Sequence, residues 1–156
     1  MKVGFYAGSF DPFTNGHLEV LKKANLLFDK VVIGMGVNPD KKRRFSETEM
    51  KEAIEKVLKR ENLSSAEVVI YKGLTVDTAK EYKSSFLIRG VRNSADYDFE
   101  ENLASINEEI SGLDTIFIRA GALNNVSSSF VYELFKNGKD VSKYLPKEIL
   151  EIMQKK

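Results

Sequence analysis

Residues 3–17 read VGFYAGSFDPFTNGH, an apolar run followed by a loop and by the start of a helical pattern. The continuous apolar run Val3–Ala7 predicts a strand buried on both faces. After the loop, Leu18, Leu21 and Ala24 recur at helical spacing. The stretch therefore predicts a β-strand, a turn and an α-helix, which is the opening of a βαβ unit.

The alternation of strand and helix continues along the whole chain. Four further apolar, largely β-branched runs predict strands: Val31–Met35, Glu67–Tyr71, Phe86–Ile88 and Thr115–Ile118. One of the intervening helical patterns has four apolar positions: Phe99, Leu103, Ile106 and Ile110. No repeat or linker divides the sequence, so we predict a single domain over residues 1–156. Its fold class is α/β, a Rossmann-like doubly wound sheet of five parallel strands with helices on both faces.

Helix boundaries are marked at several positions. Ser46 and Glu49 form a capping-box pattern that predicts a helix from Glu47 to about Arg60. Gly138 predicts the end of a later helix, and Pro146 predicts the first turn of the last one.

Composition narrows the classes of function. The chain has no cysteine, so disulfides, thiolate nucleophiles and cysteine metal sites are excluded, and its single histidine excludes a histidine-rich metal site. The formal net charge of +1 favours neither nucleic acid nor an anionic membrane as a partner. No run approaches the ~18 apolar residues of a membrane span. We expect a soluble cytoplasmic protein without a dedicated metal site.

The loop after the first predicted strand is the first candidate site, because ligands of open parallel sheets bind beyond the carboxyl ends of strands. Gly8 has no Cβ, so backbone and ligand can approach closely there. Thr14 or Asn15 is placed to cap the following helix, whose free N–H groups then face an anion. His17 follows in the first turn, where a lone histidine is also typical of a surface or packing residue. The loop has neither the P-loop nor the dinucleotide-binding pattern.

Three further segments at predicted strand ends have the chemistry of phosphate sites. They are the IRGVR turn at 88–92, the three serines at 127–129 and the basic run KKRR at 41–44. Each has a simpler interpretation, as solvated arginines, helix-capping serines or a solvated basic face. Because all three are predicted at the same sheet edge as the first loop, phosphate recognition explains them jointly.

The basic run carries an expectation of its own. Its four positive residues repel one another and have no assured partner in the sequence, which predicts a loop that is mobile until substrate phosphates arrive. Lys41 is nearest the strand end and is expected to serve turnover. Arg43 and Arg44 are expected to act through salt-sensitive attraction of substrate.

The loop sequence GSFDPFTNGH resembles the signature of the nucleotidyltransferase superfamily, in which T-x-G-H grips a triphosphate and the histidine stabilises the α-phosphate as it becomes five-coordinate. The NPDKK loop, the IRGVR turn, the 96–107 helix and the SSS segment followed by GKDVSKYLP resemble, in order, the phosphopantetheine adenylyltransferases over essentially the whole chain. The resemblance implies transfer of AMP from ATP to 4′-phosphopantetheine, giving dephospho-coenzyme A and pyrophosphate. It also implies Mg²⁺ arriving with ATP and a homo-oligomer, typically a hexamer.

The same resemblance implies roles for individual residues. Those implied in catalysis are His17, Lys41, Arg92 and Ser129. Those implied in acceptor binding are Ser9, Lys41, Thr75, Arg89 and Asn107. Those implied in ATP binding are Ser9, Phe10, His17, Gly90, Val91, Arg92, Glu100, Leu123, Asn124, Asn125, Val126, Ser127, Ser128 and Ser129. Two departures stand out: Ser9 replaces a common threonine, and residues 123–126 lack the aromatic residue usual before the serines.

Two other functions stay open from the sequence. A nucleotidyltransferase of the same class can use another acceptor, such as nicotinamide mononucleotide or glycerol 3-phosphate. A non-catalytic nucleotide-binding module can keep the same pocket. Nucleic-acid binding is the weakest alternative, because no aromatic residues are interleaved with the basic run.

Overall fold

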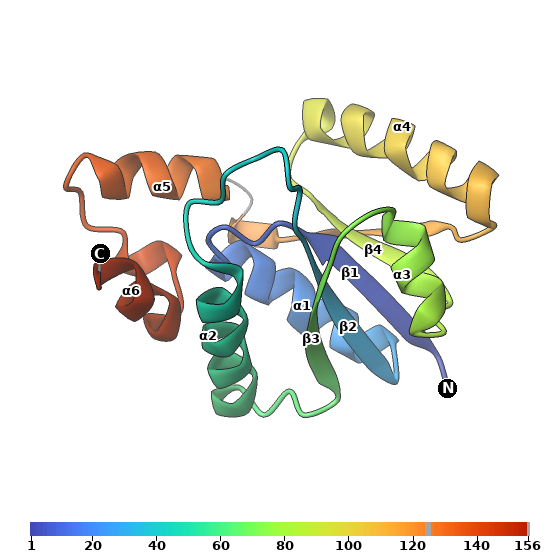
Figure 1. Cartoon of the computed structure of the whole chain (residues 1–156), viewed down its shortest axis with the longest axis horizontal. Coiled ribbons are helices and arrows are strands. Elements are labelled where there is room, and N and C mark those ends of the chain that lie inside the picture. The colour runs from blue at the N-terminus through green and yellow to red at the C-terminus, as the bar shows by residue number, and fades with distance from the viewer. Residues whose placement is uncertain (124–125, 156) are drawn as a thin grey trace.

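The computed structural model describes residues 1–123 and 126–155, which form an α/β fold around one sheet of five parallel strands (Figure 1). The strands, in chain order, are β1 (Val3–Gly8), β2 (Lys30–Gly36), β3 (Ala66–Tyr71), β4 (Phe86–Val91) and β5 (Thr115–Arg119). Their spatial order is β3-β2-β1-β4-β5. The chain therefore winds outward from β1 in one direction and then returns to its other side. The predicted Rossmann-like doubly wound sheet is confirmed.

Helices cover both faces of this sheet, as predicted (Figure 1). The helices are α1 (Asn15–Leu27), α2 (Glu47–Arg60), α3 (Thr75–Glu81), α4 (Ser94–Ser111), α5 (Ser128–Lys136) and α6 (Lys147–Gln154). Successive strand side chains point to opposite faces. Phe5 and Ala7 of β1 accordingly join a smaller core with α3, whereas Tyr6 joins the larger core with α1, α2 and α6.

The apolar, capping and glycine patterns in the sequence predicted most of the helix and strand boundaries correctly. All five predicted strands are present, the fourth continuing to Val91 and so including all of the arginine turn except Arg92. The helix predicted from Glu47 to Arg60 has those bounds, and the Ser46 side chain caps it by accepting from the Glu49 N–H at 3.3 Å. Gly138 has a φ of 76°, a left-handed conformation that suits glycine, and it directly follows Asn137, the C-cap of α5.

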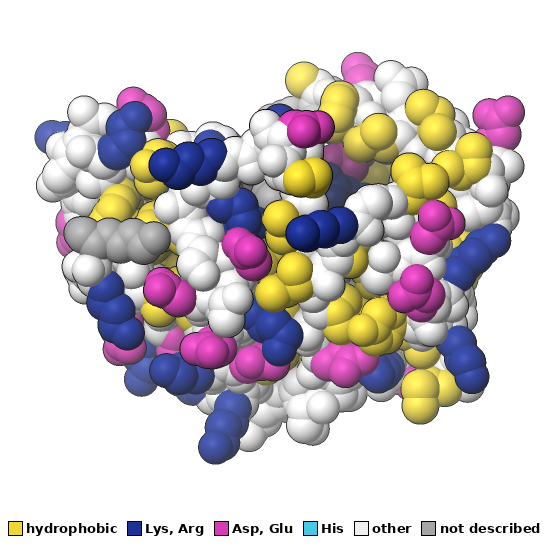
Figure 2. Space-filling model, viewed as in Figure 1, with side chains coloured by type: hydrophobic (Ala, Val, Ile, Leu, Met, Phe, Trp, Pro, Cys, Tyr) yellow, Lys and Arg dark blue, Asp and Glu magenta, His cyan; other side chains and the backbone are white. Residues whose placement is uncertain are grey.

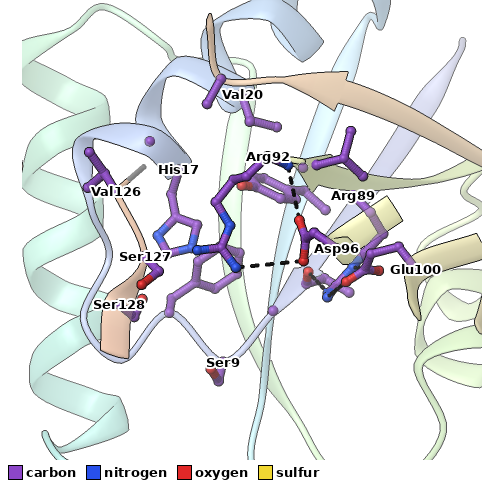
Figure 3. A pocket seen from close by; sticks show the side chains of 18 of the residues that line it. Ser9, His17, Val20, Arg89, Arg92, Asp96, Glu100, Val126, Ser127 and Ser128 are labelled. Atoms are coloured by element: carbon purple, nitrogen blue, oxygen red, sulfur yellow. Dashed lines mark hydrogen bonds and ion pairs between the residues drawn. The ribbon is translucent and has the colours of Figure 1, made fainter. Parts of the chain in front are cut away.

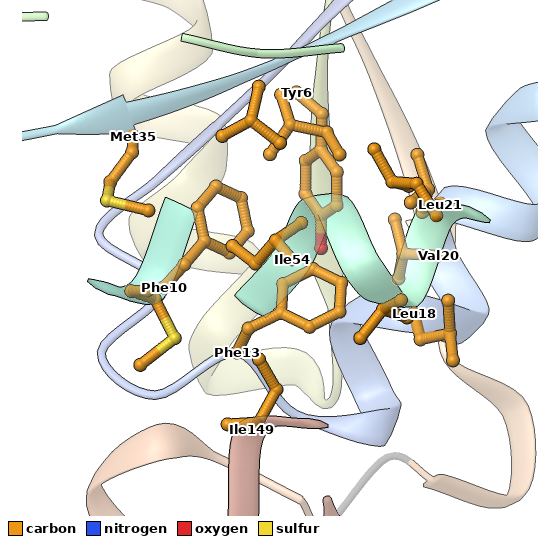
Figure 4. Packing of buried hydrophobic residues seen from close by; sticks show 14 of the residues in the cluster. Tyr6, Phe10, Phe13, Leu18, Val20, Leu21, Met35, Ile54 and Ile149 are labelled. Atoms are coloured by element: carbon orange, nitrogen blue, oxygen red, sulfur yellow. The ribbon is translucent and has the colours of Figure 1, made fainter. Parts of the chain in front are cut away.

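The larger core extends beneath the loop that joins β1 to α1. Phe10 and Phe13 of this loop point inward and pack with Ile54 of α2 and Ile149 of α6 (Figure 4). Their rings are 5.7 Å apart between centroids, and Phe10 is 1% exposed. A loop anchored by two buried aromatic rings is held against the sheet, so the polar groups beside them have defined positions.

The apolar pattern of α4 behaves differently from that of α1. Its residues do form a helix, but the apolar stripe faces outward and is 39–62% exposed: Phe99, Leu103, Ile106 and Ile110. Figure 2 shows hydrophobic side chains gathered over this helix. The buried positions of α4 are Glu100 and Ala104. In the part of the chain that the structure describes, no helix is long and apolar enough to cross a membrane.

Candidate active site

A cavity of about 270 Å³ opens at the carboxyl edge of the sheet, beside the point where the strand order reverses between β1 and β4 (Figure 3). Its walls come from the end of β1, the first turns of α1, the end of β4, the start of α4 and the start of α5. The predicted site residues that line it are Ser9, Phe10, His17, Arg89, Gly90, Val91, Arg92, Glu100, Val126, Ser127, Ser128 and Ser129. Three of the four predicted phosphate segments therefore meet in one cavity.

The β1–α1 loop shapes the floor of this cavity. Phe10 has a φ of 47°, a left-handed conformation that is uncommon for an aromatic residue. Its ring folds back under the strand, and a Cβ at position 8 would lie 3.0 Å from it. Gly8 was predicted to leave space for a ligand, but the Phe10 ring occupies much of the space left by its missing Cβ. The ring also packs edge-on against His17, with centroids 4.9 Å apart.

The His17 imidazole is held by the end of its own helix. The Thr14 N–H donates to His17 Nδ1 at 2.9 Å, and the His17 N–H donates to Thr14 Oγ1 at 3.3 Å. Because Nδ1 accepts, the proton of the neutral ring is on Nε2. Burial, followed by the positive charges of Arg89 and Arg92, lowers the pKa of His17 to about 3. At neutral pH the ring is therefore an uncharged donor in the cavity wall.

Arg89 is engaged by a buried carboxylate. Its Nε and Nη2 donate to the two oxygens of Glu100 at 2.8 and 2.7 Å, and its Nη1 donates to the Ala7 carbonyl at 2.5 Å. Glu100 is only 5% exposed. These bonds use three of the five guanidinium N–H groups. Two of the five guanidinium N–H groups of Arg89 are therefore left for a further acceptor.

Arg92 is the more available of the two arginines. Its side chain extends into the cavity toward Asp96 and is 39% exposed (Figure 3). The Arg92 N–H donates to Asp96 Oδ2 at 3.0 Å, and Nη2 lies 3.6 Å from Oδ1. Asp96 itself is fixed in the first turn of α4, where its N–H donates to the Asn93 side chain at 2.9 Å. One carboxylate therefore holds both the backbone and the guanidinium of Arg92.

The three serines have three different partners. Ser127 caps α5, accepting from the Phe130 N–H at 3.1 Å. Ser128 Oγ donates to the Pro12 carbonyl at 2.6 Å, and Ser129 Oγ accepts from Arg44 at 3.0 Å. Capping accounts for the first serine alone, and the other two tie the start of α5 to the β1–α1 loop and to the β2–α2 loop.

Comparison with known proteins agrees with this geometry. Residues 5–134 match the sequence model of the cytidylyltransferase-like family. The chain is 39% identical to a phosphopantetheine adenylyltransferase of Leuconostoc citreum, an alignment covering 100% of this chain and 99% of that protein. It is 40% identical to a phosphopantetheine adenylyltransferase of Flavobacterium johnsoniae, over 94% of this chain and 95% of the relative. The chain belongs to the phosphopantetheine adenylyltransferase family.

A solved structure supports the fold independently. A bifunctional NMN adenylyltransferase/ADP ribose pyrophosphatase from Francisella tularensis superposes with a TM-score of 0.70 at 19% sequence identity. The match covers 92% of this chain and 44% of that longer chain. At this identity the likeness concerns the fold alone.

Not every residue implied by likeness to the phosphopantetheine adenylyltransferases lines the cavity. Lys41 lies on the exposed loop after β2, where its N–H donates to the Asn38 carbonyl at 3.0 Å. Thr75 begins α3 and pairs with the Tyr71 hydroxyl at 2.8 Å. Asn107 is half-buried on α4, two turns beyond Glu100. The first two follow the carboxyl ends of β2 and β3, so they share the sheet edge with the cavity.

The predicted adenine-contacting segment is only partly described. Leu123 ends a short 3₁₀ turn, Gly121–Leu123, and Val126 lines the cavity. Asn124 and Asn125 lie outside the described residues.

The expectation that the basic run lacks partners is wrong for its second half. Arg43 donates to the Ser9 carbonyl at 2.7 Å and to the Phe45 carbonyl at 3.0 Å, and it lies 3.6 Å from Asp11. Arg44 donates to the Asp11 carbonyl at 2.9 Å. Asp11 is 8% exposed, and its carboxylate accepts from the backbone N–H groups of Arg44 and of Phe45, the residue after the run. Both arginines are thus bound to the β1–α1 loop.

Asp11, Asp96 and Tyr6 are site residues that the sequence did not predict. Asp96 and Tyr6 line the cavity, whereas Asp11 anchors the basic run. In the sequence, the local signal for Asp96 was its position four residues after Arg92 in the first turn of a helix, a spacing that allows the two side chains to pair. Among the described residues, no three His, Asp or Glu side chains form a cluster suited to a metal ion.

Proposed function

We infer that the chain is a pantetheine-phosphate adenylyltransferase, which transfers AMP from ATP to 4′-phosphopantetheine and releases pyrophosphate, forming dephospho-coenzyme A. The observation that carries this inference is full-length identity to the phosphopantetheine adenylyltransferases, supported by a cavity in which His17, Arg92 and Ser129 converge. The activity belongs to the biosynthesis of coenzyme A.

The chemistry asks the protein for positioning and charge stabilisation. An oxygen of the acceptor phosphate attacks the α-phosphorus of ATP, a new P–O bond forms, and the bond to the pyrophosphate oxygen breaks. The acceptor phosphate is already an anionic nucleophile, so no general base is needed. Negative charge builds on the oxygens around the α-phosphorus, and fixed donors at that place lower the barrier.

We assign the donors by what each residue presents to the cavity. His17 offers an Nε2–H whose direction is set by the bond from Thr14 to Nδ1. Arg92 offers a permanent positive charge held by Asp96. Arg89 offers its two remaining N–H groups toward the acceptor side, where Lys41, Thr75 and Asn107 are proposed to join it. Ser9 and the serines at 127–129 are proposed to contact the phosphates of ATP.

Three further statements are part of the proposal. Mg²⁺ arrives coordinated by the triphosphate, because hard cations keep phosphate and water as ligands. The enzyme acts in the cytoplasm. It assembles as a homo-oligomer, a hexamer by family resemblance, and the exposed apolar stripe of α4 is the surface proposed to pack against another copy. Light scattering coupled to size-exclusion chromatography measures the assembly directly.

The decisive experiment is incubation of the protein with ATP, Mg²⁺ and 4′-phosphopantetheine, followed by mass detection of dephospho-coenzyme A. Parallel reactions with nicotinamide mononucleotide and glycerol 3-phosphate measure pyrophosphate release with the alternative acceptors. We expect turnover with 4′-phosphopantetheine only. Turnover with another acceptor instead, or ATP binding without turnover, overturns the proposal.

A further inference from the structure

Arg44 connects its own β2–α2 loop to two segments that line the cavity. Its Nη1 donates to the Asp11 carbonyl at 2.9 Å, and its Nη2 donates to Ser129 Oγ at 3.0 Å. The guanidinium carbon lies 5.0 Å from the centroid of the Tyr132 ring, a cation–π distance. The Arg44 N–H also donates to the Asp11 carboxylate at 2.7 Å. One residue of the β2–α2 loop therefore holds the β1–α1 loop and the first turn of α5 together.

The start of α5 depends on such polar links. Within this helix, every residue of which is described, Val131 is the one buried residue. The hydroxyl of Ser127 is occupied as the N-cap of the helix itself. Only Ser128, which donates to the Pro12 carbonyl, and Arg44 tie the first turn to the β1–α1 loop by side-chain hydrogen bonds among the described residues. Loss of either link leaves the first turn less well placed beside the cavity.

The bond from Arg44 also orients the Ser129 hydroxyl. Because Ser129 Oγ accepts from a guanidinium, its own hydrogen points to a different acceptor, and the residue lines the cavity. A hydroxyl that accepts from a cation is polarised and becomes a better donor itself. Negatively charged phosphate oxygens are the acceptors that such a donor favours.

We propose that Arg44 is a positioning residue, which acts through Ser129 by turning its hydroxyl into a donor to a phosphate oxygen of the bound nucleotide. This inference rests on the proposed function, because it takes the ligand of the cavity to be a nucleoside triphosphate. Arg44 thus has a specific structural partner, in contrast to the diffuse attraction of substrate expected from its place in a basic run.

A double-mutant cycle tests this coupling. Arg44→Met keeps the side-chain stem over Tyr132 and removes the donors, Ser129→Ala removes the hydroxyl, and a third variant carries both changes. Each is measured for kcat, for the KM of ATP and for the Kd of α,β-methylene-ATP by calorimetry. We expect each single change to weaken nucleotide binding about fivefold, as for one hydrogen bond of a partly exposed charged pair. The double variant should lose no more than Ser129→Ala alone.

Matched variants separate this role from general charge and from stability. Lys42→Met removes the same charge from the same loop and should leave the Kd within about twofold, since Lys42 is exposed. Arg44→Lys should recover part of the binding, because one ammonium cannot reproduce the planar fork. Arg44→Gln replaces Arg44→Met if thermal melting shows that the latter is unfolded.

The outcomes distinguish the two proposals. Additive losses in the double variant, or equal losses in Lys42→Met and Arg44→Met, overturn the role of Arg44. The calorimetric cycle tests the role of Arg44 even if the wild-type protein makes no dephospho-coenzyme A. Absence of that product overturns the proposed function but not the role of Arg44.

Discussion

Replacement of His17 by alanine tests the donor role most directly. The structure presents His17 as a neutral ring whose Nδ1 is occupied by the Thr14 N–H, so one N–H is lost from the cavity. Loss of one fixed donor to developing charge costs about 2.7 kcal/mol or more, equal to about 100-fold in rate. We therefore expect His17→Ala to lower kcat about 100-fold, whereas ATP binding weakens much less, because the contact is made mainly in the transition state.

The assay compares steady-state kcat and KM with the Kd of ATP for the wild-type protein and the variant. His17→Ala also removes the partner of the Thr14 N–H, so a loss of stability of about 1 kcal/mol is expected as for other helix caps. Thermal melting checks that the variant remains folded at the assay temperature. Unchanged turnover in a folded variant refutes the donor role.

The low pKa of His17 also predicts how stability and kcat depend on pH. Between about 3 and the ordinary value of 6.5, the unfolded chain binds a proton at this residue and the folded chain does not. The stability contributed by His17 is therefore complete above pH 6.5 and is lost as pH falls toward 3. Because the ring stays neutral from pH 6 to 8, kcat should show no titration of His17 in that range. A rate step near pH 6.5 that disappears in a His17 variant contradicts the neutral-donor assignment.

The remaining predictions concern single charged residues. Arg89→Ala should mainly raise the KM of the acceptor. Arg89→Lys should not fully restore that KM, since lysine cannot keep both the Glu100 pair and the free N–H groups. Full restoration of the acceptor KM by lysine would show that only the charge matters. Lys41→Ala should lower kcat/KM at both low and high salt, with Lys42→Ala as the matched control. If the loss of kcat/KM disappears at high salt, Lys41 is only part of a positive surface. Glu148→Gln should lower the free energy of unfolding by about 1 kcal/mol, because it breaks the two-bond pair with Arg60 at 2.6 and 2.9 Å. The Arg60 hydrogen bond holds the pKa of Glu148 below its usual value, so this stabilisation is present above about pH 4.5 and fades as pH falls below it. Equal urea midpoints for the wild-type protein and Glu148→Gln at pH 7 refute this stabilising role of the pair.

Much of the fold followed from patterns between near neighbours in the sequence. The apolar run at Val3–Ala7 and the Ser46 cap depend on residues at most four positions apart, and both the strand and the cap, with its bond from the Glu49 N–H, were confirmed. The βαβ alternation then restricts the sheet to parallel strands, whose carboxyl ends share one edge. That restriction brought the His17 loop, the arginine turn and the serines into one predicted region, and they do line one cavity.

Other features depend on which distant residues meet, and local patterns carry no information about that. The apolar stripe of α4 has the spacing of a core helix, but no other element of the described chain covers it. Arg44 looks like part of a repelling basic run because its acceptors, Asp11 and Ser129, lie 33 and 85 positions away in the sequence. The Ser9 carbonyl that accepts from Arg43 lies 34 positions away.

The same reason explains the two arginines of the IRGVR turn. They look equivalent in sequence, yet Glu100 and the Ala7 carbonyl occupy three of the five Arg89 N–H groups, and Asp96 leaves Arg92 facing the cavity. Local spacing determines which backbone groups pair within a helix or strand. The net charge available at a site depends on neutralising partners that only the packed chain brings within hydrogen-bonding distance.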